Sequence, residues 1–204
     1  GYLLSLEVQP IGNNSNLPNN STLPIPTLPQ MLTGGSGGNA TGVTVNPDGT
    51  IKLTGSGINI LTAPGTTVIS GNVNTSSTQT GGTVQILGNK VGVLAGNINA
   101  NGDNGGGRVL IGGDFQGKGT IPNASQTVIS QDSTIAANAN NQGDGGRVIV
   151  WADQFTGFFG NILARGGKAA GNGGFVEVSG KELLIFNGMV DAGANVGNPG
   201  TLLL

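Results

Sequence analysis

The amino-acid sequence predicts an all-β protein, a right-handed parallel β-helix (β-solenoid) with about 25–28 residues in each coil. Three observations predict it. Glycine makes up 40 of the 204 residues, nearly three times its usual share of about 7%. Valine, isoleucine and leucine recur in short alternating runs, which are typical of strands. Two turn motifs recur at matching intervals, which indicates stacked repeats. The right hand follows from the general preference of parallel crossovers.

A high glycine content is also typical of collagen and of some disordered chains, and the composition argues against both. Collagen needs a G-X-Y period and abundant proline, whereas this chain has no such period and only 9 prolines. Disordered chains combine low hydrophobicity with high net charge, whereas 36% of these residues are hydrophobic and the net charge is −2. We therefore expect the glycines to occupy fixed structural positions.

The first 40 residues differ from the rest of the chain. Five of the nine prolines fall within residues 10–33, where they argue against a central strand because proline cannot donate to its hydrogen-bond ladder. Residues 34–38 contain only glycine and serine. We therefore predict an N-terminal strand plus a Pro/Gly-rich linker or strap over residues 1–40, and solenoid repeats over residues 41–204.

The first turn motif is a Gly-Gly pair, one further residue and then an apolar strand. It begins at residues 81, 106, 145 and 173, with a degenerate copy at 199, so the spacings are 25, 39, 28 and 26. A glycine is needed where the chain bends with positive φ or where two coils approach too closely for a Cβ atom. The predicted structural turn positions are Gly82, Gly107, Gly146 and Gly174.

The second turn motif lies between copies of the first, and it often reads Gly-Asn followed by an apolar residue. It begins at residues 71, 96, 133, 160 and 188. Asn97 and Asn161 are its predicted turn positions, and asparagines stacked in this way can form amide ladders. Both motifs share one excess of about a dozen residues near 112–126. We expect a loop that contains Asp114, Phe115 and Lys118 to protrude there.

The apolar segments between the turns are strands by pattern. Residues 84–87, 109–111, 148–151 and 176–178 are short and rich in β-branched side chains. Residues 123–142 form the one long window without glycine or proline, which leaves a helix open. Their apolar runs favour two further strands.

Several kinds of chemistry are excluded by composition. The chain has no histidine and no cysteine, so it lacks His-dependent triads, thiol nucleophiles, His- or Cys-ligated metals and disulfides. Its few basic residues are scattered, which argues against a nucleic-acid surface, and no apolar run is long enough to span a membrane. The calcium-binding repeat of solenoids is matched only in fragments at 112–114 and 143–146. We expect no cofactor and no metal.

Carboxylates leave an enzymatic alternative open. Carbohydrate-active β-helix enzymes can work with paired carboxylates, and Asp153 and Glu182 stand about one coil apart. Asp103 and Asp144 lie in Gly-rich turns, where aspartate is a turn former. The same two aspartates precede Arg108 and Arg147 by a few residues, so surface ion pairs are expected there.

Aromatic residues cluster after the third Gly-Gly motif. The cluster consists of Trp151, Phe155, Phe158 and Phe159. Two interpretations remain: an aromatic stack inside the core, or an exposed patch for carbohydrate binding or assembly.

Residues 105–119, 143–153 and 171–181 resemble the repeat region of filamentous-haemagglutinin-like adhesins of the two-partner secretion pathway. They are most similar to the high-molecular-weight adhesins and the large cyanobacterial homologues. The resemblance implies a β-helix that passes an outer-membrane transporter and is displayed outside a Gram-negative-type bacterium such as a cyanobacterium. The family's secretion domain carries Asn-Pro-Asn motifs, from which residues 46–48 depart. We therefore expect that domain to be absent.

The sequence thus predicts a non-enzymatic structural or adhesive segment of a large secreted protein of the cell surface or extracellular matrix. Its expected partners are further copies of itself and cell-surface or matrix carbohydrate or protein. Both ends of the repeat array lack an evident cap. Because capping repeats normally prevent stacking, we expect end-to-end or lateral self-association.

Overall fold

The computed structural model describes residues 42–45, 51–54, 59–60 and 65–204. The strap predicted for residues 1–40 and the departing motif at 46–48 lie outside the described residues. Within them the strands β1 (Gly42–Val45), β2 (Ile51–Thr54) and β3 (Asn59–Ile60) form a small antiparallel sheet. The first coil begins after this sheet.

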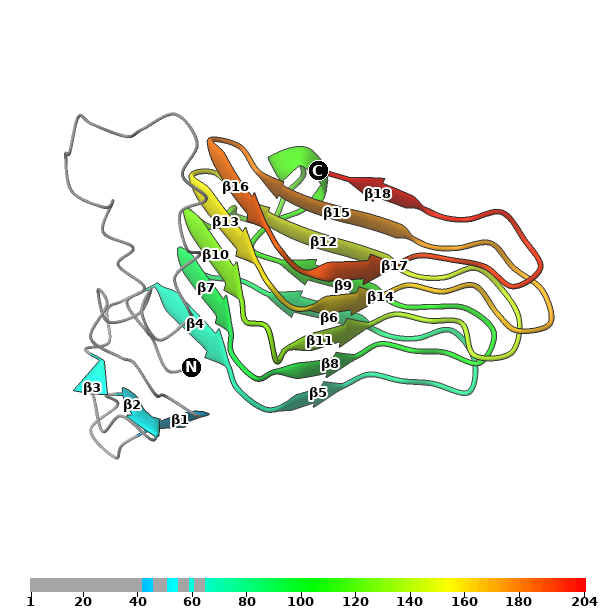
Figure 1. Ribbon diagram of the computed structural model, residues 1–204, viewed down its shortest axis with the longest axis horizontal. Coiled ribbons are helices and arrows are strands. Elements are labelled where there is room, and N and C mark those ends of the chain that lie inside the picture. The colour runs from blue at the N-terminus through cyan, green and yellow to red at the C-terminus, as the bar shows by residue number, and fades with distance from the viewer. Residues whose placement is uncertain (1–41, 46–50, 55–58, 61–64) are drawn as a thin grey trace.

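The coils are stacked side by side, and each contributes three strands (Figure 1). In chain order the coils are β4 (Thr66–Ile69), β5 (Asn72–Asn74) and β6 (Thr83–Ile86); β7 (Lys90–Val93), β8 (Asn97–Asn99) and β9 (Arg108–Ile111); β10 (Gln126–Ile129), β11 (Thr134–Ala136) and β12 (Arg147–Ala152); β13 (Phe155–Phe158), β14 (Asn161–Leu163) and β15 (Phe175–Gly180); and β16 (Leu183–Phe186), β17 (Met189–Asp191) and β18 (Thr201–Leu203).

Equivalent strands of successive coils pair in parallel and make three five-stranded sheets. We call them the first-strand sheet (β4, β7, β10, β13, β16), the second-strand sheet (β5, β8, β11, β14, β17) and the third-strand sheet (β6, β9, β12, β15, β18). Thr83 pairs with Arg108, Arg108 with Arg147, Arg147 with Phe175 and Phe175 with Thr201. These steps reproduce the intervals of the Gly-Gly motif. The predicted all-β parallel solenoid is confirmed, including strands rather than a helix within residues 123–142.

The core is a thin column of aliphatic side chains inside the coils. Alternate residues of the strands in the coils point inward, so each stacks on its counterpart one coil away. Val109, Val148 and Val176 form one such column and are fully buried. Ile98, Ile135 and Ile162 form another. Burial of each such side chain stabilises the fold by about 1.5–3 kcal/mol.

Threonine side chains satisfy carbonyl groups where the third strand turns back towards the first-strand sheet. The hydroxyl of Thr127 donates to the carbonyl oxygen of Trp151 at 2.7 Å, and that of Thr156 donates to Ser179 at 2.8 Å. Both threonines are buried. Because a buried unpaired hydroxyl is unfavourable, these bonds account for polar residues beside the core.

Between its second and third strands each coil extends into a narrow hairpin loop, seen at the right of Figure 1. We call the stack of these loops the fin; it comprises residues 75–82, 100–107, 137–146, 164–174 and 192–200. A backbone bond closes each loop at its foot, as where the Gly107 N–H donates to the Ala100 carbonyl at 2.8 Å. A Cβ atom on Gly107 would lie 2.2 Å from the Gly82 oxygen. The foot of the fin is therefore open only to glycine.

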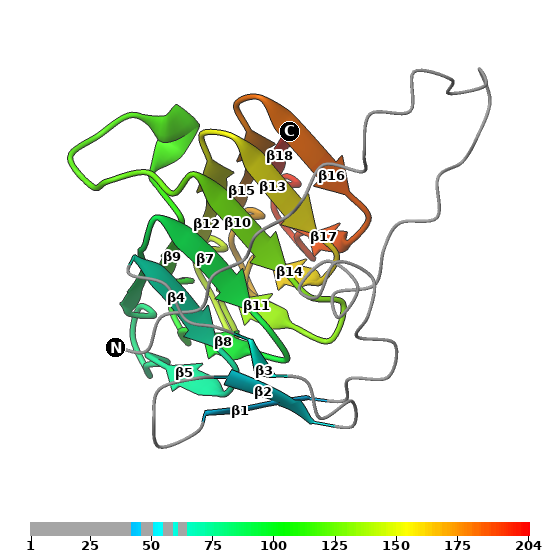
Figure 2. The ribbon, with the colours of Figure 1, turned by 90° about the vertical axis from the view of Figure 1, so that its left-hand side faces the viewer.

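One corner carries an insertion. Most turns from the third strand of one coil to the first strand of the next are short and occupy residues 87–89, 153–154 and 181–182. The turn after β9 is much longer and occupies residues 112–125. This insertion loop contains the 3-10 turn η1 (Phe115–Gly117) and stands out beside the stack (Figure 2). Its neck is tight, because the Ala124 N–H donates to the Gly112 carbonyl at 2.6 Å. The loop then folds back onto the outer face of the third-strand sheet.

Candidate binding groove

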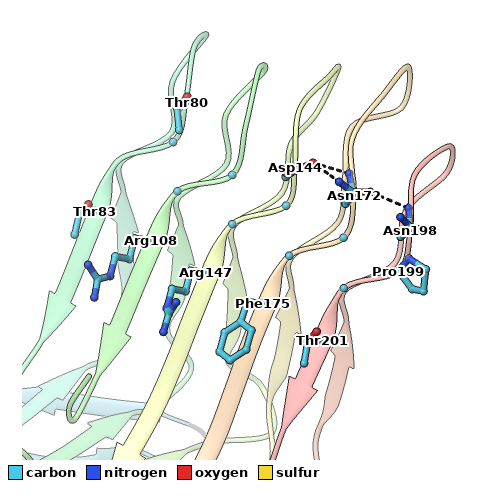
Figure 3. Close-up of a pocket in the computed structure, with 18 residues that line it drawn as sticks. Thr80, Thr83, Arg108, Asp144, Arg147, Asn172, Phe175, Asn198, Pro199 and Thr201 are labelled. Carbon is cyan, nitrogen blue, oxygen red and sulfur yellow. Dashed lines mark hydrogen bonds between the residues drawn. The ribbon is translucent and has the colours of Figure 1, made fainter. Parts of the chain in front are cut away.

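A groove runs along the solenoid where the third-strand sheet meets the foot of the fin. Its volume is about 770 Å³. Its edge is formed by the outward residue at the start of each third strand, which lies beside its counterpart in the next coil (Figure 3). This row consists of Thr83, Arg108, Arg147, Phe175 and Thr201.

The backbone in this row is already hydrogen-bonded. The N–H groups of Arg108, Arg147 and Phe175 donate to the glycine carbonyls of the preceding coil at 2.9–3.0 Å. The Gly107 and Gly146 N–H groups close the fin within their own coils. Side chains therefore carry most of the bonding capacity of the groove.

Arg147 stacks against two aromatic rings that also touch each other. Its guanidinium carbon is 5.0 Å from the ring centre of Phe115, which comes from the insertion loop, and 4.8 Å from that of Phe175. The two rings meet edge to face at 5.6 Å. Among the described residues the Arg147 side chain makes no hydrogen bond or ion pair, and its Nε is buried without a partner. The rings thus hold a cation whose donors are unused.

Arg108 is held differently from its neighbour in the row. One guanidinium nitrogen donates to both oxygens of Asp114 at 2.8 Å. Partial burial alone would raise the pKa of Asp114, but the Phe115 N–H and the Arg108 guanidinium outweigh it, so the pKa lies below its ordinary value. The predicted pairing of Arg108 with Asp103 is wrong, because the insertion loop supplies a nearer carboxylate. The predicted Arg147–Asp144 pair is also not formed, because Arg147 stacks on the rings.

A second hollow of about 360 Å³ adjoins the groove and shares both of its arginines. Asp114, Phe115, Lys118 and Gly119 of the insertion loop complete its lining. Lys118 donates to the Gln116 side-chain oxygen at 2.9 Å and is exposed. All three predicted loop residues therefore line the hollow that adjoins the groove.

Glu177 lies beneath η1 and was not identified from the sequence. Its side chain is fully buried, and both carboxyl oxygens lie 3.1 Å from the Gln116 N–H. Burial raises the pKa of Glu177, and the Gln116 N–H offsets this only in part. Position 177 alternates with inward Val176 and Val178, so its outward direction could be predicted, but its burial depends on a loop 61 residues earlier.

The insertion loop is fastened at Asp153, which also accepts a hydrogen bond from Trp151 of the sheet. The indole N–H donates to Asp153 at 3.1 Å, and Asn123 donates both to Asp153 at 3.1 Å and to the Gly117 carbonyl at 2.9 Å. Asp153 is therefore a structural acceptor. Its predicted catalytic partner, Glu182, is an exposed residue of the corner one coil further along.

The four clustered aromatic residues do not form one exposed patch. Phe158 lies in the core and stacks on Phe186 with ring centres 5.3 Å apart. Trp151 and Phe155 are 7% and 8% exposed, and Phe159 is half-buried. The side chains diverge because alternate strand residues face opposite sides of a sheet.

The predicted turn residues lie at two places in the coils, the foot of the fin and the start of the second strand. Gly82, Gly107, Gly146 and Gly174 are at the foot of the fin, where neighbouring atoms, most of them backbone, leave no room for a Cβ atom. Asn97 and Asn161 begin β8 and β14 and both pair with Thr134.

Asparagine side chains form hydrogen bonds between neighbouring coils in the fin instead. The Asn101 side chain accepts the Asn138 N–H at 2.6 Å, and the Asn172 side chain accepts the Asn198 N–H at 3.0 Å.

The described residues contain no cluster of three or more metal-ligating side chains. The same part of the chain has no helix of the length and apolar character needed to cross a bilayer.

No protein-family model and no curated protein sequence matches the chain. A solved structure does: the HMW1 secretion domain from Haemophilus influenzae, with a TM-score of 0.54 and 34% sequence identity. The match covers 66% of this chain and 35% of the other, so this chain spans about a third of that domain's length. The expectation that no secretion domain is present gains no support from this likeness, and neither does a cyanobacterial source.

Proposed function

We propose that the chain is a segment of an adhesin-related protein that a Gram-negative bacterium secretes by the two-partner pathway. One observation carries the proposal: the solenoid is similar to the HMW1 secretion domain in both fold and sequence. Outside the cell the segment acts as a structural or adhesive rod of the surface or matrix. Its partners are an outer-membrane transporter during export and carbohydrate, protein or further copies of itself afterwards.

The hydrogen-bond pattern suits this role. Each described coil after the first pairs all three of its strands with those of the coil before it. A stack of this kind can fold by adding one coil at a time, and it needs no disulfide, since the chain has no cysteine. A chain that crosses the outer membrane unfolded could thus fold as it emerges.

Export tests the proposal. We would place the chain behind a signal peptide in bacteria that carry the HMW1 transporter, once alone and once behind the HMW1 secretion domain, and measure the extracellular fraction. Export of the chain alone shows that it carries the transporter's recognition signal. Export only behind the HMW1 domain shows that it is a passenger and that its own secretion domain is absent. If neither is exported while the HMW1 domain alone is, the proposal is wrong.

The alternative of a carbohydrate-active enzyme stays a prediction of the sequence. The described carboxyls with opposite pKa shifts next to the groove are Asp114 and Glu177, and the second of these is fully buried beneath η1. Incubation of the chain with candidate polysaccharides, followed by analysis of soluble fragments, tests for catalysis. Released fragments would establish the enzyme.

A further inference from the structure

We infer that the groove centred on Arg147 is a binding site for an acidic polysaccharide, a chain of carboxylate-bearing sugars lying along the solenoid axis. This ligand would serve the adhesive role proposed above. The inference rests on that proposal only in placing the ligand outside the cell. The binding itself is a property of the purified chain.

The charge around Arg147 is positive in an otherwise acidic protein. The chain has eight basic residues and a net charge of −2. Three of the eight, Arg108, Lys118 and Arg147, line the hollow beside the groove together with a single carboxylate, Asp114. Asp144, which also lines the groove, already accepts two bonds from Asn172, at 2.7 and 3.1 Å. The cations of the hollow outnumber its one carboxylate, so an anion entering beside Arg147 is attracted, and the buried Glu177 carboxyl beneath η1 offsets part of this attraction when it is ionised.

Arg147 is oriented in advance for a carboxylate. Stacking on Phe115 and Phe175 restricts its side chain before any ligand arrives, so less conformational entropy is lost on binding. Its guanidinium is engaged by no described acceptor. A planar guanidinium binds a carboxylate through two parallel hydrogen bonds, one of the stronger polar contacts in proteins.

The remainder of the groove suits sugars better than a peptide. A peptide strand gains affinity from backbone bonds at a free sheet edge, and the backbone of this row is already paired with neighbouring coils. Hydroxyl groups of Thr83 and Thr201 lie at the two ends of the row. Asn172 and Asn198 line its other side. The row spans five coils and therefore four steps of about 4.8 Å, which make it roughly 19 Å long and suit an oligosaccharide rather than one sugar.

Calorimetry on the purified 204-residue chain tests the inference, with a hexameric oligogalacturonate as the probe. We expect saturable binding that weakens as salt is added. The Arg147→Gln variant should bind roughly tenfold to a hundredfold more weakly, because a hydrogen bond to a charged group is lost. The matched control is Arg165→Gln. It removes the same charge from a side chain that is bonded to Asp191 and Asn195 away from the groove, and should bind as the wild type does.

Other probes determine whether the ligand class is right. A neutral hexasaccharide and free galacturonate should bind much more weakly than the oligogalacturonate. Equal binding of the neutral sugar, or of poly-aspartate, would overturn the assignment to acidic sugars. Equal affinity of wild type and Arg147→Gln would overturn the site.

Melting curves establish that each variant is folded. Arg147→Lys provides a second comparison, because lysine keeps the positive charge and lacks the planar guanidinium that donates two parallel hydrogen bonds. It should bind with intermediate affinity, and wild-type affinity for it would count against a paired carboxylate. The outcome is separable from that of the proposed function. Arg147→Gln should be exported like the wild type, and a chain that is not exported can still bind the oligosaccharide in solution.

Discussion

Gly107 shows how the absence of a side chain allows the backbone segments at the foot of the fin to approach one another closely. A Cβ atom there would lie 2.2 Å from the Gly82 oxygen and 2.8 Å from the Ala100 oxygen, both of which are backbone atoms. The two strands of the loop and the neighbouring coil would all have to move to admit it. Backbone hydrogen bonds connect these segments, so the displacement would spread beyond one residue.

We therefore predict that Gly107→Ala lowers the free energy of unfolding by about 1–3 kcal/mol, as overpacking does. The control is Gly71→Ala, because a Cβ atom at Gly71 meets nothing within 4 Å. That variant should be neutral or more stable by up to about 1 kcal/mol, since alanine restricts the unfolded chain. Urea denaturation of the two variants measures both effects. Equal stability of the two would show that close approach is not the reason for glycine at the foot of the fin.

Glu177 gives the molecule a specific dependence on pH. Its pKa in the folded chain is raised above the ordinary value of 4.5, chiefly by burial, so the folded state favours the protonated form. Its contribution to stability is therefore fully present below about pH 4.5 and is lost as the pH rises through the folded pKa. The lowered pKa values of Asp114 and Asp191 act in the opposite direction, because their contribution is lost on acidification.

Glu177→Gln isolates this effect. Relative to the glutamine variant, the wild-type chain should lose stability as the pH rises from about 4 to about 7, because only glutamate ionises under the loop. Thermal unfolding of both proteins at a series of pH values provides the measurement. A constant difference in melting temperature across that range would mean that Glu177 titrates as an exposed carboxyl does.

Residues were predicted well from the sequence where their role is set by their own coil, and poorly where it is set by another segment. The Gly-Gly motif located the foot of the fin, since the requirement repeats in every coil. The partners of Arg108 and Arg147 were missed because they depend on where the insertion loop folds. Spacing along the chain reveals that an insertion exists and says little about which surface it covers.

Among the elements, the insertion loop has the clearest separate role. Trp151, Leu110 and Ile149 lie on the outer face of the third-strand sheet and form a small apolar cluster, against which Phe115 and Ile121 of the loop pack. Without the loop this face would be exposed to solvent. The loop thus supplies a second, smaller core outside the coil.

We predict that replacing residues 112–125 with the Leu-Gly-Asn corner of residues 87–89 leaves the coils intact and exposes this cluster. Far-ultraviolet circular dichroism should still show β-structure. The emission of Trp151, the only tryptophan, should shift to longer wavelength. Stability should fall by roughly 2–4 kcal/mol from the lost burial.

Phe115→Ala serves as the milder comparison, because the loop stays and loses only one of the side chains that pack on the cluster. It should shift the emission less. A replacement protein with unchanged emission would show that the loop does not cover Trp151.

For the molecule as a whole, one repeated unit determines both the shape and the order of contacts. Each coil contacts mainly its neighbours, so the periodic sequence was enough to predict the parallel solenoid and its register. The antiparallel strands β1–β3 follow no such period and were not anticipated. The repeat is therefore sufficient to predict how the coils stack. The structure of segments outside the repeat depends on contacts that their own sequence does not reveal.

The fifth coil differs from the others in its exposure. The large apolar side chains that are exposed in the described part of the chain all fall between residues 183 and 204, and Leu202 among them is 42% exposed. Leu202 pairs with the core residue Val176, so it continues an inward column at the end of the stack. Met189 is 64% exposed and pairs with Asn161 on the side of the stack. The end face and the side of the fifth coil thus carry two different exposed apolar side chains.

We predict that the purified chain self-associates through the end face of the fifth coil, where each strand of the coil pairs with a described strand on one side only. Sedimentation velocity over a range of concentrations should show species larger than the monomer. Leu202→Lys should shift the distribution back to monomer, because a charge would be buried where two end faces meet. Met189→Lys adds the same charge to the side and should have no effect. The reverse response of the two variants would indicate lateral association, and a monomer at high concentration in the wild type would contradict self-association of either kind.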